Sequence, residues 1–234
     1  MRPIRIALTK GRLETRSVRL FEAIGFDCAQ LNAKGRRLIL PMEYPGSPRN
    51  PQVPWGVYEV VLAKAPDVLT YVGHGACDIG IVGKDTILEA GGATSLAGAT
   101  SPAGDVYEML DLGFGKCRFA LAGPAGKDFT LGYHERIVAT KYPNVARRFF
   151  EHKGMDVKII RIDGSVELAP LLGLAHAIVD IVETGSTLRE NGLAVYEDIM
   201  PISARVIVNR AAMKLRRGEI ERLLADMELA VQVN

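Results

Sequence analysis

One segment of the sequence brings together residue types suited to holding a phosphorylated sugar. An apolar run at 177–182 carries Asp180, and Glu-Thr-Gly-Ser-Thr follows it at 183–187. If the run is a buried strand and a helix begins near Leu188, the N–H groups of the turn point outward with partial positive charge. Gly185 would let the backbone approach an anion closely. Three hydroxyls add donors: Thr184, Ser186 and Thr187.

A purely structural interpretation of the same turn is also open. Thr187 and Glu190 have the spacing of a capping box, which needs no ligand. The carboxylates of Asp180 and Glu183 favour the ligand site, because a ribose diol beside a phosphate needs acceptors. The turn at 163–167 is open in the same way, since Ser165 suits a helix cap and Glu167 suits the helix dipole.

Cationic residues gather at further predicted strand ends. Lys10, Gly11 and Arg12 follow the first apolar run, where a helix start normally disfavours cations, so a role with phosphates is indicated. A second cluster and a third turn could act alike, or serve only as a solvated turn and a helix cap. The second cluster consists of Lys34, Arg36 and Arg37. The third turn consists of Gly83, Lys84 and Asp85.

Composition narrows the class of protein. The chain has 234 residues, 48% of them hydrophobic, and a net charge of +2, which suits a globular protein without a polybasic nucleic-acid surface. Its three cysteines form no CxxC pair and its four histidines lack metal spacing, so neither a disulfide framework nor a zinc site is expected. The first residues lack a signal peptide, and no apolar run could span a membrane. We expect a soluble, cytoplasmic protein.

Apolar runs alternate with amphipathic segments along the chain. Strands are expected at 4–8, 38–40, 57–62, 78–82, 117–122, 136–140, 158–162, 177–182 and 205–208. Helices are expected at 13–24, 67–73, 143–154 and 165–174, with a closing helix through 220–231, and loops at 45–54 and 91–104. The alternation predicts an α/β protein with mostly parallel sheets, in two lobes with a cleft between them and a boundary near residue 95.

The spacing of residues 167–188 resembles a family signature. A glutamate, a glycine six residues on, and then D-hydrophobic-x-x-[ST]-G-x-T-L all recur here, as in ATP phosphoribosyltransferases. Further stretches are similar to that family at 6–13, 78–85, 112–118 and 139–147, so the resemblance covers nearly the whole chain. The length resembles the short form of the family, which lacks a C-terminal regulatory domain.

The resemblance implies a fold and a set of partners. The family has two α/β lobes like type II periplasmic binding proteins, with the active site in the inter-lobe cleft. Lobe I would comprise residues 1–95 plus about 193–234, and lobe II about 96–192. The substrates would be ATP and phosphoribosyl pyrophosphate (PRPP), and a regulatory subunit resembling a histidyl-tRNA synthetase would complete a hetero-oligomer.

Site residues follow from the same resemblance. Residues 183–188 would hold the 5′-phosphate of PRPP, with Asp180 and Glu167 near the ribose hydroxyls. Lys10, Arg36 and Lys64 would act in catalysis. ATP would be bound by Lys10, Gly11, Arg12, Arg36, Arg37, Gly83, Lys84 and Asp85. Two residues depart from the family: Lys64 stands where arginine is frequent, and His176, given no catalytic role, replaces a usual aspartate.

The implied reaction is the opening step of histidine biosynthesis. Adenine N1 of ATP attacks C1 of PRPP and pyrophosphate leaves. The N1 lone pair is free at neutral pH, so positioning and charge neutralisation would carry the catalysis. Mg²⁺, held mainly by substrate phosphates, is the expected cofactor. The alternatives are a bilobal anion-binding protein, which would predict a secretory signal, and another cytosolic phosphoribosyltransferase, which would predict adjacent acidic residues before the loop.

Overall fold

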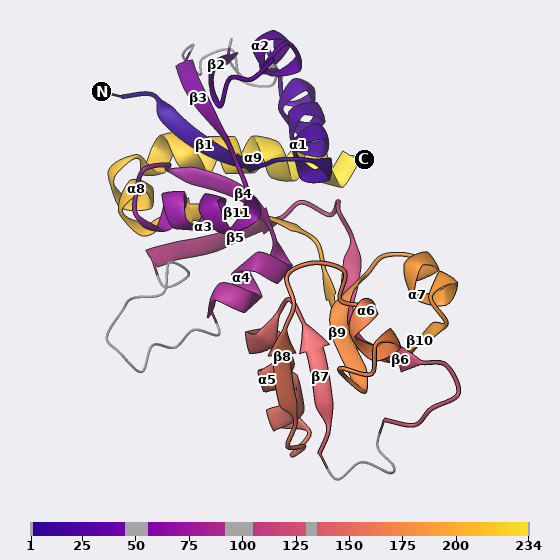
Figure 1. Ribbon diagram of the computed structural model, residues 1–234. Helices are drawn as coiled ribbons and strands as arrows, with labels where there is room; N and C mark the ends of the chain where they lie inside the picture. The colour runs from indigo at the N-terminus through magenta and orange to yellow at the C-terminus, as the bar shows by residue number, and fades with distance from the viewer. Residues whose placement is uncertain (1, 45–55, 92–104, 130–134, 234) are drawn as a thin grey trace. The chain divides into compact units, whose positions relative to one another are not determined.

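The computed structural model describes residues 2–44, 56–91, 105–129 and 135–233, so most of the two expected loops lies outside the described residues. The chain forms two compact units (Figure 1). Unit 1 comprises Met1–Ile87, Thr94–Gly115 and Ser203–Asn234, and unit 2 comprises Leu88–Ala93 and Lys116–Ile202. None of the described helices is long and apolar enough to cross a membrane.

Unit 1 is built on a six-stranded sheet in the order β2-β3-β1-β4-β11-β5. The strands are β1 (Ile4–Thr9), β2 (Ile39–Tyr44), β3 (Gly56–Ala63), β4 (Ile79–Gly83), β5 (Val106–Asp111) and β11 (Ala204–Asn209). The three central strands β3, β1 and β4 run parallel, whereas β2, β11 and β5 pair with their neighbours in antiparallel fashion. The carboxyl ends of β1, β3 and β4 therefore meet at one edge of the sheet.

Helices cover both faces of this sheet. They are α1 (Arg12–Ala23), α2 (Ala29–Asn32), α3 (Ala65–Gly73), α8 (Arg210–Leu215) and α9 (Arg217–Val233), while α4 (Lys84–Gly91) crosses the boundary between the units. The fully buried Phe21 of α1 packs into a core with Ile6 and Leu8 of β1 and Met227 of α9. On α3, Val72 lies so near β4 that a Cβ added at Gly80 would be 2.8 Å from it, which explains the glycine.

Unit 2 is built on a five-stranded sheet in the order β10-β6-β9-β7-β8. The strands are β6 (Cys117–Pro124), β7 (Ile137–Thr140), β8 (Lys158–Arg161), β9 (Ala177–Val182) and β10 (Leu193–Ile202). The strands β8, β7 and β9 are parallel, and β6 and β10 are antiparallel. One face packs on α5 (Pro143–His152), and the other on α6 (Leu168–Leu171) and the five-residue α7 (Ser186–Glu190).

Both faces of the unit 2 sheet are covered by apolar cores, and alternate residues of β9 point into one core and the other. Val179 belongs to the core beneath α5, and its neighbour Ile178 belongs to the core beneath α6 and α7. Burial on two sides explains why the run at 177–182 is apolar throughout except at Asp180. The strand expected from that run has the observed bounds.

All nine expected strands are present, eight of them with shifted ends, but three expectations are corrected. The sheets are mixed, not mostly parallel, because β11 and β6 run opposite to the parallel strands beside them. The helix expected at 165–174 is reduced to α6, a single turn. The helix expected to begin at Asp67 has Lys64 as its N-cap, because Pro66 suits the first turn and Asp67 lies within it.

The expected lobe boundaries also differ from the units at two strands. They assign β5 to lobe II, whereas β5 pairs with β11 in the sheet of unit 1. They assign β10 to lobe I, whereas β10 pairs along its length with β6 in unit 2. Strand pairing decides both placements, and β10 itself was not expected because polar residues interrupt its apolar pattern.

Candidate functional site

Unit 1 gathers cations at the edge where its parallel strands end. Thr9 of β1 pairs with Ala63 of β3, so Lys10 and Lys64 are the first residues beyond two neighbouring strands. The Lys10 backbone N–H donates to the Ala63 carbonyl at 2.9 Å, which fixes the two chain exits side by side. Both lysines are exposed. Long cationic side chains at adjacent strand ends can meet the phosphates of one ligand.

The second cationic cluster lies at the same edge. β2 runs antiparallel to β3, and the Leu62 N–H donates to the Leu38 carbonyl at 2.8 Å, so the residues before β2 lie beside the end of β3. Arg36 is exposed, and within the described residues its side chain has no hydrogen bond or ion pair. Arg37 differs, because its guanidinium donates to the Gln30 side chain at 3.2 Å and to the Ala33 carbonyl at 3.3 Å.

The turn after β1 is shaped by a glycine and a glutamate. Gly11, the N-cap of α1, has φ 94°, and its N–H donates to Glu14 at 3.4 Å. Glu14 is buried and also forms an ion pair with Lys34. Lys34 therefore neutralises the glutamate that caps the start of α1, whereas Lys10 and Arg12 are exposed at the strand end.

The third expected turn is occupied by contacts of its own. Lys84 forms a 2.5 Å ion pair with Glu108 of β5, and Glu108 also meets Arg205 at 3.5 Å. A Cβ at Gly83 would lie 2.0 Å from Asp85 Oδ1, so only glycine permits that carboxylate to fold back on the turn. These contacts give Gly83, Lys84 and Asp85 a structural role that the sequence does not reveal.

Unit 2 has a different kind of strand end. Gly185, the N-cap of α7, is in the left-handed conformation with φ 74° and ψ 11°. The hydroxyl groups of Thr184 and Ser186 form a hydrogen bond of 3.1 Å. Glu183 and Thr187 are exposed beside them. The side chain of Leu188 is buried and anchors the turn to the core. The expected turn from strand to helix is thus present, with α7 beginning at Ser186.

Two carboxylates and a lysine lie near the end of the same strand. Burial raises the pKa of Asp180 to about 6; the Ile181 backbone hydrogen bond opposes the rise, the Glu167 carboxylate adds to it, and Lys141 opposes it. The pairing of Thr140 with Val179 explains the lysine, because Lys141 is the first residue after β7 and Asp180 follows Val179 on the neighbouring strand. Sequence reasoning missed Lys141, although it noted the stretch at 139–147.

Two arginines near the turn also escaped prediction. Arg118 on β6 lies opposite Val182, forms a 2.5 Å ion pair with Asp198, and points one nitrogen to the Glu183 carbonyl at 3.4 Å. Arg189 on α7 donates to the Thr184 carbonyl at 3.0 Å. Arg118 is distant in sequence, so only strand pairing could find it. Arg189 could have been found from its position four residues after Gly185.

His176 has a structural partner. The His176 side-chain Nδ1 accepts from the Ile137 backbone N–H at 3.0 Å, and the His176 backbone N–H donates to the Ile137 carbonyl at 2.8 Å. The residue thus extends the pairing of β7 with β9. These two bonds hold His176 at the start of β9.

Comparison with known proteins shows which family carries this arrangement. A family model described as ATP phosphoribosyltransferase matches residues 64–229. The ATP phosphoribosyltransferase of Clostridium kluyveri is 53% identical over 234 residues, covering 100% of this chain and 95% of that protein. That of Clostridium acetobutylicum is 52% identical and covers 98% and 96%. The chain belongs to the ATP phosphoribosyltransferase family.

Solved structures agree with this family and with the expected fold. The ATP phosphoribosyl transferase (HisG:HisZ) complex from Thermotoga maritima has a chain that matches with a TM-score of 0.74 and 30% identity, covering 99% of this chain and 100% of that one. The periplasmic aliphatic sulphonate binding protein SsuA from Escherichia coli matches with a TM-score of 0.57 at 15% identity, which shows likeness of fold alone. The two-lobe architecture like that of periplasmic binding proteins is confirmed.

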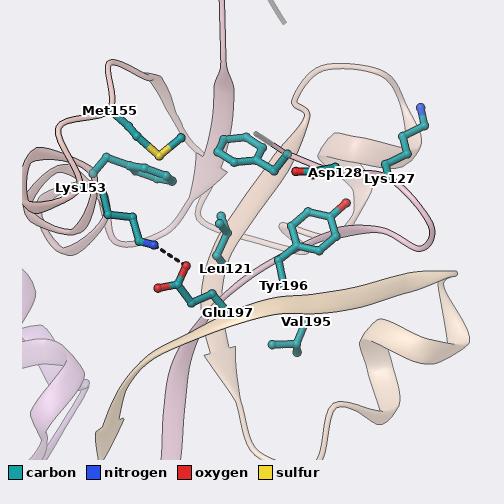
Figure 2. A pocket seen from close by; sticks show the side chains of 10 residues that line it. Leu121, Lys127, Asp128, Lys153, Met155, Val195, Tyr196 and Glu197 are labelled. Carbon is teal, nitrogen blue, oxygen red and sulfur yellow. Dashed lines mark hydrogen bonds and ion pairs between the residues drawn. The ribbon is translucent and has the colours of Figure 1, made fainter. Parts of the chain in front are cut away.

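Unit 2 of this chain also has a hollow that no predicted site residue lines. It lies in unit 2 with a volume of about 500 Å³ and an apolar wall that includes Leu121, Phe150 and Met155. Figure 2 shows Lys153 reaching Glu197 beside it, in an ion pair of 2.6 Å. Leu121, Phe150 and Met155 belong to the face of the sheet that packs on α5, whereas Leu188 anchors the turn at 183–187 on the opposite face.

Proposed function

We propose that this chain transfers the phosphoribosyl group of PRPP to N1 of the adenine of ATP and releases pyrophosphate, the first step of histidine biosynthesis. The observation that carries the proposal is the turn at 183–187. It combines a left-handed Gly185 with outward hydroxyls in a chain that is 53% identical over its full length to an ATP phosphoribosyltransferase.

In this proposal the turn of unit 2 holds the 5′-phosphate of PRPP. Backbone N–H groups at a helix start carry partial positive charge, and the Thr184, Ser186 and Thr187 hydroxyls can donate beside them. Asp180 and Glu167 supply acceptors for the ribose hydroxyls. The half-buried position of Asp180 on β9 strengthens such a hydrogen bond, because nearby water is reduced.

The cations at the edge of unit 1 would meet the pyrophosphate and the phosphates of ATP. Lys10 and Lys64 leave neighbouring strands, and Arg36 stands exposed beside them. Arg12 and the Gly11 turn are at the same edge. We assign smaller parts in ATP binding to Arg37 and to residues 83–85, because they already make contacts within the protein.

The chemistry requires little proton transfer from the protein. Adenine N1 has a free lone pair, and the bond from C1 to the pyrophosphate oxygen breaks as the bond from C1 to N1 forms. Positive charge develops at the ribosyl centre and negative charge on the leaving group. Lys10, Lys64 and Arg36 would stabilise the leaving pyrophosphate, and the turn of unit 2 would hold the sugar in place.

Mg²⁺ is proposed as the cofactor, held mainly by substrate phosphates. Such a cation prefers oxygen ligands and retains several waters, and two polyphosphates supply those oxygens. Within the described ranges no three His, Cys, Asp or Glu side chains converge on a point where a metal could sit. When bound, Mg²⁺ would supply further positive charge at the leaving group.

A regulatory partner is also proposed. The Thermotoga maritima chain that matches over 100% of its length was solved in a HisG:HisZ complex. We infer that this chain forms a hetero-oligomer with a regulatory subunit resembling a histidyl-tRNA synthetase, in the cytoplasm, where three free thiols suit a reducing setting. Histidine should then inhibit the isolated chain poorly and inhibit the reconstituted complex strongly. Strong inhibition of the isolated chain would contradict the partner.

A direct test of the activity uses the purified chain with ATP, PRPP and Mg²⁺. We expect pyrophosphate release that requires both substrates, together with new absorbance near the adenine band. Each substrate alone is the control. Formation of a nucleoside monophosphate from a free base, with ATP inert, would show a different phosphoribosyltransferase.

A further inference from the structure

The carbonyl groups of the unit 2 turn are bonded by side chains that lie outside the family signature or at its border. Arg189 Nη1 donates to the Thr184 carbonyl at 3.0 Å, and Asn191 Nδ2 donates to the Thr187 carbonyl at 2.8 Å. Arg118 Nη1 approaches the Glu183 carbonyl at 3.4 Å. Three carbonyls of the turn, those of Glu183, Thr184 and Thr187, therefore each have a side-chain donor.

This arrangement matters because each peptide unit has two ends. A carbonyl oxygen carries negative partial charge, and near a phosphate it would repel the ligand. A donor that holds the carbonyl also fixes the peptide plane and so directs the N–H of the following residue. The Thr184 carbonyl belongs to the peptide that carries the Gly185 N–H, so a bond to this carbonyl orients the turn at its most critical residue.

Arg189 differs from Arg118 in the charge it retains. Arg118 is paired with Asp198 at 2.5 Å, whereas no described carboxylate forms an ion pair with Arg189. Its Nη1 would lie 3.3 Å from a Cβ placed on Gly185, so the guanidinium sits directly beside the glycine. The side chain is exposed and thus has no role in the core. It combines a hydrogen bond to the turn with an unpaired positive charge close to it.

We propose that Arg189 is a positioning residue for PRPP, which holds the Thr184 carbonyl away from the phosphate and keeps the turn in its binding conformation. The inference rests on the proposed function, because it takes the turn as the site of the 5′-phosphate. Arg189 itself does not touch the reacting atoms. Its loss should therefore weaken PRPP binding without changing the chemical step or the binding of ATP.

The test compares three variants with the wild type in steady-state kinetics. Arg189→Met keeps the stem and removes donor and charge, and should raise KM for PRPP roughly tenfold, with kcat and KM for ATP within about twofold of wild type. Arg189→Lys keeps a charged donor and should recover most of the loss. Arg222→Met is the matched control, because Arg222 of α9 is likewise exposed and donates to the carbonyl of Gly218 at 2.8 Å.

Salt separates positioning from simple attraction. Screening weakens an exposed charge but leaves a fixed peptide orientation in place, so the ratio of KM values between Arg189→Met and wild type should persist in 0.5 M salt. A ratio that falls to one in salt would overturn the positioning role. An unchanged KM for PRPP in Arg189→Met, or an equal rise in Arg222→Met, would overturn it as well.

Failure of the proposed function would look different. The wild type would then release no pyrophosphate from ATP and PRPP at all. Melting curves of the Arg189 and Arg222 variants, compared with that of the wild type, show whether the fold is retained.

Discussion

The strand ends of the two units, which the proposed function assigns to anion binding, are built by contrasting means. Unit 1 presents long cationic side chains, Lys10, Lys64 and Arg36, beyond strands that pair side by side. Unit 2 presents backbone N–H groups and short hydroxyls on a turn fixed by Gly185, with Arg189 and Asn191 holding its carbonyls. In the proposed function, unit 1 would thus bind phosphates through exposed charged side chains, and unit 2 through a turn of fixed backbone conformation.

This contrast has a consequence for mutation. Flexible cations share a polyphosphate among several groups, so removal of one leaves the others to compensate. A turn that meets a single phosphate depends on its backbone conformation, and one residue in the left-handed region controls that conformation. We therefore expect damage to be concentrated at one glycine in unit 2 and to be distributed over several cations in unit 1.

Gly185→Val should have the largest effect. At φ 74° a β-branched residue is strongly disfavoured, and the added carbon would lie 3.3 Å from Arg189 Nη1. Loss of two charge-assisted hydrogen bonds should weaken PRPP binding roughly 10²–10⁴-fold, with ATP binding largely intact. Calorimetric titration of each substrate measures this, once circular dichroism shows the fold retained. If PRPP affinity stays normal and only stability falls, the turn is a helix cap and nothing more.

Lys10→Ala and Lys64→Ala should have the next largest effects. Each should lower kcat/KM about 10–100-fold, because one charge-assisted contact to a phosphate contributes about 1.5–3 kcal/mol. The double variant should lose less than the product of the two, since both serve one polyphosphate. Lys158→Ala is the control, because Lys158 is the first residue of β8 in unit 2 and so lies at the amino end of a strand, not at its carboxyl end. Near-normal kinetics in both single variants would place the pyrophosphate elsewhere.

Arg36→Ala and Arg37→Ala should separate function from structure within one cluster. Arg36 is exposed without a described partner, so its removal should lower kcat/KM about tenfold and leave the melting temperature unchanged. Arg37 bonds the Gln30 side chain and the Ala33 carbonyl, so its removal should cost about 1 kcal/mol of stability and little activity. The opposite pattern, with activity lost only at Arg37, would exchange their roles.

Asp180 should give the smallest effect, a dependence of stability on pH. Burial raises the pKa of Asp180 to about 6, above the usual value for aspartate, so the folded state binds a proton more tightly than the unfolded state does. The stability contributed is present at low pH and is lost as pH rises from about 4 through about 6. Asp180→Asn should therefore melt a few degrees higher relative to wild type at pH 7.5 than at pH 5.

Glu167→Gln sharpens this prediction. The Glu167 carboxylate adds to the rise in the pKa of Asp180, so its removal should reduce the pH dependence of the wild type. A difference in melting temperature between Asp180→Asn and wild type that stays constant with pH would contradict the shift.

Much of unit 2 could be predicted from local sequence. The run at 177–182 is apolar because both its faces are buried, and the glycine, the hydroxyls and the helix start follow directly from it. In unit 1 the cations were visible in sequence, but their meeting at one edge depends on parallel pairing of β1 with β3 and antiparallel pairing of β2. Periodicity does not encode strand order, and the mixed sheets were missed for that reason.

The missed residues have the same cause. Lys141 is beside Asp180 only because β7 pairs with β9, and Arg118 reaches the turn only because β6 lies on the other side of β9. Lys84 looked available for phosphate, yet its partner Glu108 is brought to it by β5 through the order of the sheet. Long-range pairing decides which charges are free and which are paired, and local sequence gives no measure of it.

The central claim is that adenine N1 of ATP attacks C1 of PRPP. The most direct measurement uses ATP labelled with ¹⁵N at N1, incubated with the chain, PRPP and Mg²⁺, and followed by nuclear magnetic resonance with a parallel assay of pyrophosphate. We predict a large shift of the N1 signal, coupling of N1 to the ribose carbon, and one pyrophosphate released for each adduct. Pyrophosphate release with the N1 signal unchanged would mean hydrolysis or attack by another atom, and would contradict the proposed reaction.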